Sequence, residues 1–437
     1  MITDMDVNRF ATHSLKDVRI QRILSAALKA VDPFDAVQKH LPNMDGMDGR
    51  VYGLGIGKAS IPMLDALAGR IPLSGGLAVT KFGSGLGRKW YPVIESGHPV
   101  PDSRSLHAGE RVLEFVSSLQ AEDTLVCLIS GGGSALMTLP YEGITLDDIQ
   151  SLTRALLACG APIDEINTIR RHLDRVKGGG VARATKARVI SLILSDVIGN
   201  PLEAIASGPT ASDPTTKADA LAILKKYDIA KIVSKSILAT LLRAPSPALA
   251  AGDGGGSISN RVQNIIVGDN RLAAQASSQQ AQLEGFHAEI LANDLQGEAR
   301  DVGVMLARKL RAEISKAQAP FCLIVGGETT VTINGEGKGG RNQELALAAV
   351  KELAGLEDGM LISLATDGDD GPTDAAGAVS TGESAQRATS LGLDAADYLS
   401  RNDAYPFFEA LGDLLKTGPS GTNVNDLIFL IHGSMHK

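Results

Sequence analysis

The feature that most limits the possible folds is a recurring order of segments, in which a short apolar run is followed by a glycine-rich turn and a longer amphipathic stretch. The order is present in RVYGLGIG followed by KASIPMLDALAG, in TLVCLISGGG followed by SALMTL, and in NIIVGDN followed by RLAAQASSQQAQLEG. Short apolar runs that alternate with helical segments are typical of βαβ units and parallel sheets. The pattern predicts an α/β fold with the glycine-rich turns at the carboxyl ends of the strands, where such sheets bind ligands.

The length of 437 residues predicts two domains, because it exceeds what one hydrophobic core usually organises. Residues 244–260, APSPALAAGDGGGSISN, are rich in proline, glycine and serine and show no periodicity. This segment is the best linker candidate, and a long surface loop is the alternative. We therefore expect an N-terminal domain over residues 1–250 and a C-terminal domain over residues 251–437.

Composition argues against several classes of partner. A formal net charge of -8 and an aromatic share of 4% disfavour nucleic acid. The chain starts without the pattern of a signal peptide, and no apolar run approaches the roughly 20 residues of a membrane helix. Cys127, Cys159 and Cys322 show neither a disulfide framework nor zinc spacing. We expect a reduced cytoplasmic protein that acts on small molecules, with no nucleic-acid or membrane partner, and homo-oligomerisation is left open.

Two glycine-rich turns in the first half are candidates for anion binding. GLGIGKAS, residues 53–60, fits neither the P-loop nor the dinucleotide spacing, which leaves a strand-to-helix turn with Gly57 and Lys58. ISGGGSALM, residues 129–137, offers backbone N–H groups that no side chain shields. The candidate residues in this second turn are Ser130, Gly131, Gly132, Gly133 and Ser134. The simpler readings are a solvated lysine and a tight turn.

Two charged positions follow these turns. Lys177 precedes a second glycine triplet in RRHLDRVKGGGVAR, where an ordinary solvated helix face is an equal alternative. Asp196 comes directly after the apolar run SLILS. A carboxylate at the end of a strand could bind Mg²⁺, accept a proton or cap a turn.

The stretch TINGEGKGGRNQELA, residues 332–346, has dinucleotide spacing in its glycines but adds Lys338 and Arg341 to the loop, with Glu328 nearby. We expect a strand over 329–334 and a helix over 342–353. A dinucleotide site also needs an acidic residue at the end of the next strand, about 20 residues on. The next apolar run is MLISLAT, and the first acidic residue after it is Asp367, about 30 residues beyond the glycine loop. The loop therefore favours a phosphoryl group over NAD, with its glycines giving clearance for the phosphate and its cations stabilising transferred charge.

A second acidic turn, ATDGDDGPTDAAG, contains Asp367, Asp369, Asp370 and Asp374. Gly371 occupies a position where an EF-hand needs an oxygen ligand, so calcium binding of that type is excluded. Carboxylates this close together repel one another unless a cation or an arginine is near. The turn indicates Mg²⁺ with a nucleotide or a salt-bridged contact, and a solvated Asp-Gly turn is the alternative.

Taken together, these segments resemble the glycerate 2-kinases whose C-terminal half is called the MOFRL domain. The matching motifs are GIGKAS, ESGHPVPD, LISGGGSALM, RRHLDRVKGGGVA, LSDVIGNPLEAIASGPT, GGETTVTINGEGKGGRNQE, ATDGDDGPTDAAGA and GTNVNDL, in the family's order over nearly the whole chain. The resemblance implies two α/β domains, the first Rossmann-like with a largely parallel sheet, and an active site in the cleft between them. It also implies ATP-dependent phosphorylation of the 2-hydroxyl of D-glycerate with Mg²⁺, and a catalytic pair of Lys58 and Arg341.

The resulting hypothesis assigns a role to each candidate. The SGGGS loop and cationic groups hold the carboxylate of glycerate, and Mg²⁺ with Asp196 or Asp367 bridges the ATP phosphates. Asp196 is also the candidate base, and Asn342 of the GGRNQE motif joins the phosphate-binding set. Two alternatives stay open, an NAD(P)H-dependent hydroxypyruvate reductase and a non-catalytic sensor of phosphorylated acids.

Overall fold

A computed structural model of the chain describes residues 7–41, 49–83, 90–243, 260–316 and 320–433, so the expected linker lies almost wholly outside the described residues. The chain forms two compact units. The first unit comprises residues 36–267, and the second unit combines residues 1–35 with residues 268–437. The expected division near residue 250 therefore differs from the structure, because the units change between residues 267 and 268 and the first 35 residues belong to the second unit.

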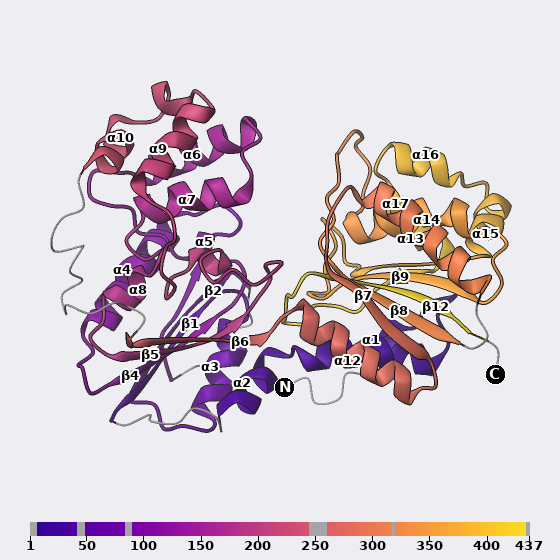
Figure 1. The fold of residues 1–437 in the computed structure, drawn as a ribbon, viewed down its shortest axis with the longest axis horizontal. Coiled ribbons are helices and arrows are strands. Elements are labelled where there is room, and N and C mark those ends of the chain that lie inside the picture. Colours follow the sequence, from indigo (N-terminus) through magenta and orange to yellow (C-terminus); the bar gives the residue numbers. More distant parts are fainter. Residues whose placement is uncertain (1–6, 42–48, 84–89, 244–259, 317–319, 434–437) are drawn as a thin grey trace. The chain divides into compact units, whose positions relative to one another are not determined.

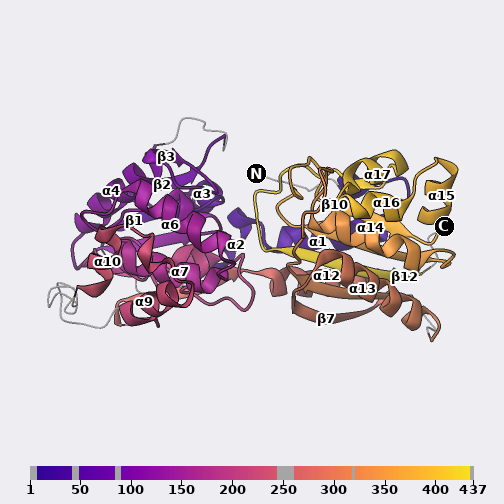
Figure 2. The same ribbon diagram turned by 90° about the horizontal axis from the view of Figure 1, so that it is seen from above.

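The N-terminal segment joins the second unit through helix α1 (Val18–Ala30). Ile20, Leu24 and Leu28 recur at helical spacing and are buried, and α1 packs on α12 (Asn270–Leu283). The two helices lie side by side in both views of the ribbon (Figures 1 and 2). A contact between segments so far apart in sequence leaves no local pattern, which explains why the sequence did not predict it.

The first unit is built on a six-stranded sheet in the order β3-β2-β1-β4-β5-β6. Its strands are β1 (Val51–Ile56), β2 (Gly75–Lys81), β3 (Val93–Ser96), β4 (Thr124–Ile129), β5 (Arg188–Leu194) and β6 (Val262–Gly268). β1 pairs in parallel with β2 and β4, and so do β2 with β3 and β4 with β5. Ile129 pairs with both Ile56 and Ile193, so β1, β4 and β5 end level with one another. This confirms the predicted, largely parallel sheet.

Helices of the first unit cover this sheet and add a separate apolar cluster (Figure 1). They are α2 (Pro33–His40), which spans the junction of the units, α3 (Ser60–Ala68), α4 (Ser103–Ser117), α5 (Gly133–Leu136), α6 (Leu146–Ala158), α7 (Ile163–Leu173), α8 (Gly180–Arg183), α9 (Lys217–Lys226) and α10 (Lys235–Leu242). Short 3-10 helices span Ile205–Ser207 and Ile229–Lys231 in this unit, and a further one, Val7–Phe10, belongs to the second unit. No helix in the described part of the chain is long and apolar enough to cross a bilayer.

The second unit contains a mixed six-stranded sheet in the order β11-β10-β9-β12-β8-β7. Its strands are β7 (His287–Leu295), β8 (Phe321–Gly327), β9 (Gly359–Ala365), β10 (Gly377–Thr381), β11 (Leu414–Leu415) and β12 (Asp426–His432). Its further helices are α13 (Ala299–Ile314), α14 (Arg341–Leu353), α15 (Ser384–Ser390), α16 (Ala395–Ser400) and α17 (Ala404–Leu411). β12 runs antiparallel between β8 and β9, so Asp426 at its start pairs with Gly327 and Ala365 at their ends. In Figure 1, α1 and α12 lie on one face of this sheet and α13 and α14 on the other.

The predicted strand over 329–334 is absent from the second unit, and that prediction was wrong. Only Thr330 makes an isolated bridge, with Glu298. Gly327 at the end of β8 pairs with Leu295, the last residue of β7, and with Asp426, the first residue of β12, so the chain beyond β8 has no neighbouring strand among the described residues to pair with. The Asn402 side chain instead accepts hydrogen bonds from the N–H groups of Asn334 and Gly335. The predicted helix is confirmed as α14.

Candidate active site

The turn after β1 is fixed to the turn after β4. Gly57 has φ +117°, and a Cβ there would lie 2.4 Å from both the carbonyl oxygen and the Oγ of Ser130. The N–H of Lys58 donates to the Gly131 carbonyl at 3.0 Å, and the N–H of Ala59 donates to Ser130 Oγ at 3.0 Å. Only glycine suits position 57, because a side chain would push the two turns apart. The contact brings Lys58 to the SGGGS loop.

Three side chains converge on the glycines of that loop. A Cβ on Gly131 would lie 2.0 Å from Asp196 Oδ2, and one on Gly132 would lie 3.1–3.3 Å from the His98 ring and from Lys58 Cγ. The strands that carry these residues end at the same edge of the sheet, which explains the convergence. The predicted residues Lys58 and Asp196 are thus placed together. His98 was not among the predicted site residues, although the quoted motif ESGHPVPD contains it.

The backbone of the same loop is unusual in its hydrogen bonding. Within the described ranges, no protein acceptor lies opposite the N–H groups from Gly131 to Ser134, and the Lys58 ammonium has no partner. Gly131 and Gly133 are buried. Buried N–H groups without a partner are rare, and a row of them suits an anion. Asp196, by contrast, already takes part in an interaction within the protein.

The far side of the loop is held by a strained turn. Ala206, Ser207 and Gly208 have φ values of 50°, 60° and 62°, although only the last is glycine. Ser207 Oγ lies 2.8 Å from Ser134 Oγ, and the Ala206 side chain occupies the space beside Gly133. Such strain costs on the order of 1–3 kcal/mol per residue and concentrates at functional sites. The Ser134 hydroxyl is therefore already hydrogen-bonded within the protein, to Ser207 at one side of the loop.

Lys177 has an internal role that the sequence did not predict. Its side chain is 3% exposed, and its ammonium donates to the Met137 carbonyl at 2.8 Å and to Asp174 Oδ2 at 2.9 Å. Burial lowers the pKa of Lys177, and the Asp174 carboxylate acts against that change. The side chain ties the end of α5 to residue 174. We therefore do not retain Lys177 as a substrate contact.

Arg341 in the second unit is held by two carboxylates. Its Nε donates to Asp426 Oδ2 at 2.6 Å and its Nη2 to Asp426 Oδ1 at 3.0 Å. Its Nη1 lies 2.7 Å from Glu328 Oε1. Burial opposes the charge, but the hydrogen bond and charge of Asp426 and the charge of Glu328 outweigh it and raise the pKa of Arg341. The guanidinium is thus fixed at the ends of β8 and β9, and a third of the Arg341 side chain stays exposed.

The glycines before Arg341 do not provide the clearance that the sequence suggested. Cβ atoms on Gly335 and Gly337 would lie 2.4 Å and 2.5 Å from the Arg401 carbonyl oxygen, and one on Gly340 would lie 2.3 Å from Asp370 Cγ. The space that each missing side chain leaves is filled by the protein itself. These glycines allow the loop to pack closely on residues 401–404 and on Asp370, so the expected clearance for a phosphoryl group was wrong.

Asp370 also occupies the start of α14. Its carboxylate accepts hydrogen bonds from the N–H groups of Asn342 and Gln343 at 3.1 Å and 2.9 Å. Burial, reinforced by the charge of Asp426, raises the pKa of Asp370 to about 7. A dinucleotide fingerprint needs these N–H groups for the pyrophosphate. They are already used, which argues against NAD in this loop.

The remaining predicted residues of this loop have partners within the protein. The Asn342 side chain donates to Asp370 and accepts a hydrogen bond from Ser363, and it is buried. The Lys338 ammonium lies 3.9 Å from the centre of the Tyr405 ring. Asn342 therefore stabilises the start of α14, whereas the exposed Lys338 lies against the ring of Tyr405, a residue that is itself buried.

The two predicted metal ligands belong to different units, Asp196 to the first and Asp367 to the second. Among the described residues, no three His, Cys, Asp or Glu side chains are grouped closely enough to hold a metal ion. Mg²⁺ commonly binds through one or two carboxylates together with substrate phosphates. The carboxylates present fit that kind of site, and a cage made wholly of protein ligands is not found among the described residues.

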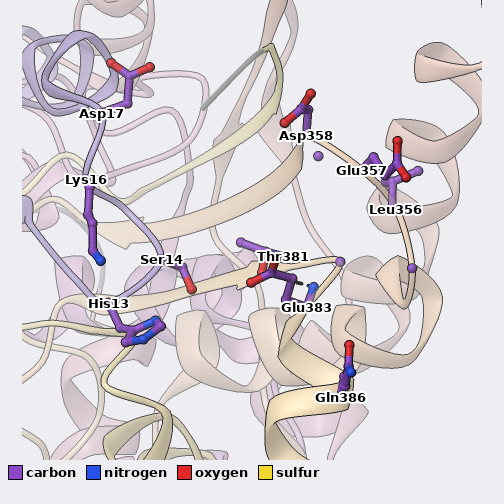
Figure 3. Close-up of a pocket in the computed structure, with 13 residues that line it drawn as sticks. His13, Ser14, Lys16, Asp17, Leu356, Glu357, Asp358, Thr381, Glu383 and Gln386 are labelled. Carbon is purple, nitrogen blue, oxygen red and sulfur yellow. Dashed lines mark hydrogen bonds between the residues drawn. The ribbon is translucent and has the colours of Figure 1, made fainter. Parts of the chain in front are cut away.

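A cavity of about 650 Å³ in the second unit lies away from Arg341. It is lined by residues 13–17, 355–359 and 381–386, near the beginning of β9, whereas Asp426 pairs at the end of that strand. Its charged side chains, Lys16 and Glu357 among them, are spread around the cavity and do not converge (Figure 3). This geometry does not favour a catalytic site there.

Comparison with known proteins decides the family. Residues 19–242 match the family described as "Domain of unknown function (DUF4147)", and residues 321–426 match the MOFRL family. A glycerate 2-kinase of Pyrococcus horikoshii is 40% identical over 428 residues, covering 94% of this chain and 96% of the relative. The chain belongs to the glycerate 2-kinase family.

Two further relatives frame the comparison. The crystal structure of a glycerate kinase from Thermotoga maritima superposes with a TM-score of 0.86 at 41% identity, covering 94% of this chain and 98% of that one. A relative from Agrobacterium vitis carries the provisional name hydroxypyruvate reductase and is 39% identical over 423 residues, 95% of this chain and 94% of the relative. Both family matches include site residues, since Lys58 lies in the first and Arg341 in the second.

Proposed function

We propose that this protein is a glycerate 2-kinase, which transfers the γ-phosphoryl group of ATP to the 2-hydroxyl of D-glycerate. Relatives named glycerate 2-kinase and glycerate kinase match it over nearly its whole length, at about 40% identity. The arrangement of the first unit supports this reading independently of the names, because it presents backbone donors and a cation to an anionic ligand.

The observation that carries the proposal is the row of N–H groups from Gly131 to Ser134 beside the Lys58 ammonium, none of which has a partner among the described residues. An anionic oxygen would satisfy buried N–H groups that otherwise cost free energy. We assign the carboxylate of glycerate to this loop. Lys58, whose side chain lies against Gly132, is close enough to the loop to neutralise charge on the same ligand.

The phosphoryl group needs fixed positive charge, because its transition state spreads negative charge over the equatorial oxygens. We propose that Lys58 and Arg341 supply it. Mg²⁺ would be held by Asp196 or Asp367 together with phosphate oxygens, and its contribution is to neutralise the phosphates of ATP. A cleft between the two units as the place of reaction stays a prediction.

The phosphate position on the product tests the proposed function. Purified protein with ATP, Mg²⁺ and D-glycerate should give 2-phosphoglycerate, identified by its ³¹P resonance and its coupling to the proton on carbon 2. A product phosphorylated on carbon 3, or no product at all, would refute the assignment.

The reductase alternative rests on the name of the Agrobacterium vitis relative. Against it, Asp370 already takes the N–H groups that a pyrophosphate would need at the start of α14. We expect no loss of NADH or NADPH absorbance with hydroxypyruvate in the absence of ATP. Turnover of D-glycerate by the wild-type protein would also exclude a purely sensory role.

Two further predictions concern the setting of the reaction. The cytoplasmic location rests on the composition and on cysteines that are all unpaired, Cys127 and Cys322 buried and Cys159 exposed. Homo-oligomerisation is untested, and size-exclusion chromatography with light scattering measures it directly.

A further inference from the structure

The two residues before His98, at the end of β3, are held by hydrogen bonds. Ser96 Oγ donates to the Leu136 carbonyl at 2.6 Å, which ties the strand to α5. The N–H of Gly97 donates to Asp102 Oδ1 at 3.2 Å, and a Cβ on Gly97 would lie 2.8 Å from the Val100 carbonyl oxygen. The backbone before His98 therefore has little freedom, so the imidazole is presented in a defined position.

The imidazole lies against the same glycine as the Lys58 side chain. Its Cδ2 and Nε2 atoms are 3.1 Å and 3.2 Å from the position of a Cβ on Gly132, and Lys58 Cγ is 3.3 Å from it. The Nε2 edge of the ring is thus turned toward the loop whose N–H groups lack acceptors. A ligand bound by that loop would come within reach of both side chains.

The ring nitrogens are also available. No described residue hydrogen-bonds to His98 or pairs with it, whereas the carboxylate of Asp196 already has an interaction within the protein. His98 is an exposed residue at this edge of the unit, so a proton that it accepts can leave to solvent. Of the two candidate bases beside the loop, His98 is the one with no protein partner among the described residues.

The charge state of His98 suits a proton acceptor. Although His98 is an exposed residue as a whole, neighbouring protein atoms desolvate its ring, and this desolvation, together with the positive charges of Lys58 and Lys81, lowers the pKa of His98 to about 4. The ring is therefore neutral near pH 7 and keeps a lone pair. A pKa in this range matches that of the aspartate that accepts the hydroxyl proton in protein kinases, where the loose transition state needs little help from a strong base.

We propose that His98 is a catalytic residue, the base that accepts the proton of the 2-hydroxyl; this role rests on the function proposed above. The hydroxyl oxygen forms a bond to the γ-phosphorus of ATP as its proton passes to the imidazole. The bond between the γ-phosphorus and the bridging oxygen breaks, its electron pair leaves with ADP, and the imidazolium releases the proton to water.

The test compares wild-type protein with His98→Asn, His98→Gln and His98→Ala in a steady-state assay with ATP, Mg²⁺ and D-glycerate. We expect kcat to fall by about 10²–10⁴-fold, the usual worth of a general base, with KM for D-glycerate unchanged. Free imidazole should restore turnover to His98→Ala in proportion to its concentration. His107→Asn, on the exposed surface of α4, is the matched control and should keep wild-type kcat.

Each result decides the question. A fall in kcat with rescue by imidazole supports the role. Retained kcat, a change confined to KM, or a low kcat that imidazole does not raise overturns it. Circular dichroism verifies the fold of each variant, and the glutamine variant replaces the asparagine variant if the latter unfolds. An inactive wild type would refute the proposed function itself, whereas an active wild type with an equally active His98→Asn would refute only the base.

Discussion

Replacing Arg341 by Gln should lower both turnover and stability, and the two effects have different causes. In the structure the guanidinium makes two hydrogen bonds to Asp426, whose side chain is 3% exposed. Without the guanidinium this buried carboxylate loses its cation, a change that typically costs about 3–5 kcal/mol of unfolding free energy. The expected loss lies near 3 kcal/mol, the lower end of that range, for two reasons. The glutamine amide can still donate one hydrogen bond to Asp426, and a third of the arginine side chain is exposed to solvent in the wild type.

The double variant Arg341→Gln with Asp426→Asn separates these effects, because it removes both charges and leaves two amides that can hydrogen-bond. Its unfolding free energy should return to within about 1 kcal/mol of wild type, since no buried charge is left unpaired and Glu328, which also loses the arginine, is 42% exposed. Its kcat should stay about 10³-fold below wild type, as for other arginines that stabilise a transferred phosphoryl group. That factor corresponds to about 4 kcal/mol of activation free energy.

The assay pairs urea unfolding, followed by far-ultraviolet circular dichroism, with ADP release at saturating ATP and D-glycerate. Arg300→Gln is the matched control, because Arg300 also pairs with a carboxylate that is 3% exposed, Glu344, in the same unit. It should lose a similar amount of stability and keep its turnover. If turnover recovered together with stability in the double variant, Arg341 would be a structural residue and the reasoning would fail.

Three further predictions concern Gly131, Asp370 and Lys177. Gly131→Ala places a methyl group 2.0 Å from Asp196 Oδ2 and should lower kcat by about 10²-fold in a folded protein, whereas Gly69→Ala, at an ordinary helical φ of -72°, should leave kcat unchanged. The pKa of Asp370 is raised from its ordinary value of 3.8 to about 7, so the folded protein favours the protonated acid. The stability that this acid contributes is fully present below pH 3.8 and is lost as the pH rises from there to 7. Urea unfolding should show wild type losing about 1.4 kcal/mol per pH unit relative to Asp370→Asn between pH 4 and 7, and a constant difference would contradict the buried acid. Lys177→Met leaves the carboxylate of Asp174, which is 4% exposed, without its cation, and should lower the unfolding free energy by about 3–5 kcal/mol. An unchanged midpoint of urea unfolding would show that the ion pair is dispensable.

Local sequence patterns predicted the architecture and half of the candidate site. Apolar runs followed by glycine turns identified β1, β4 and β6, because a parallel strand and the turn after it are encoded within about ten residues. Since parallel strands end at one edge of a sheet, the same patterns also predicted that the glycine-rich turns carrying Lys58 and Gly131 would lie at that edge. The structure brings these residues into contact distance, together with Asp196.

Other features depended on what fills the space around a residue, and segments distant in sequence decide that. Gly335 and Gly337 have dinucleotide spacing, yet their open sides are taken by the backbone of Arg401, and Asp370 occupies the start of the following helix. His98 joins the site because β3 lies in the same sheet as β1 and β4. A strand of only four residues is too short for its sequence to predict its place in that sheet. Periodicity reports which face of a segment is buried, whereas only the folded chain determines which groups meet there.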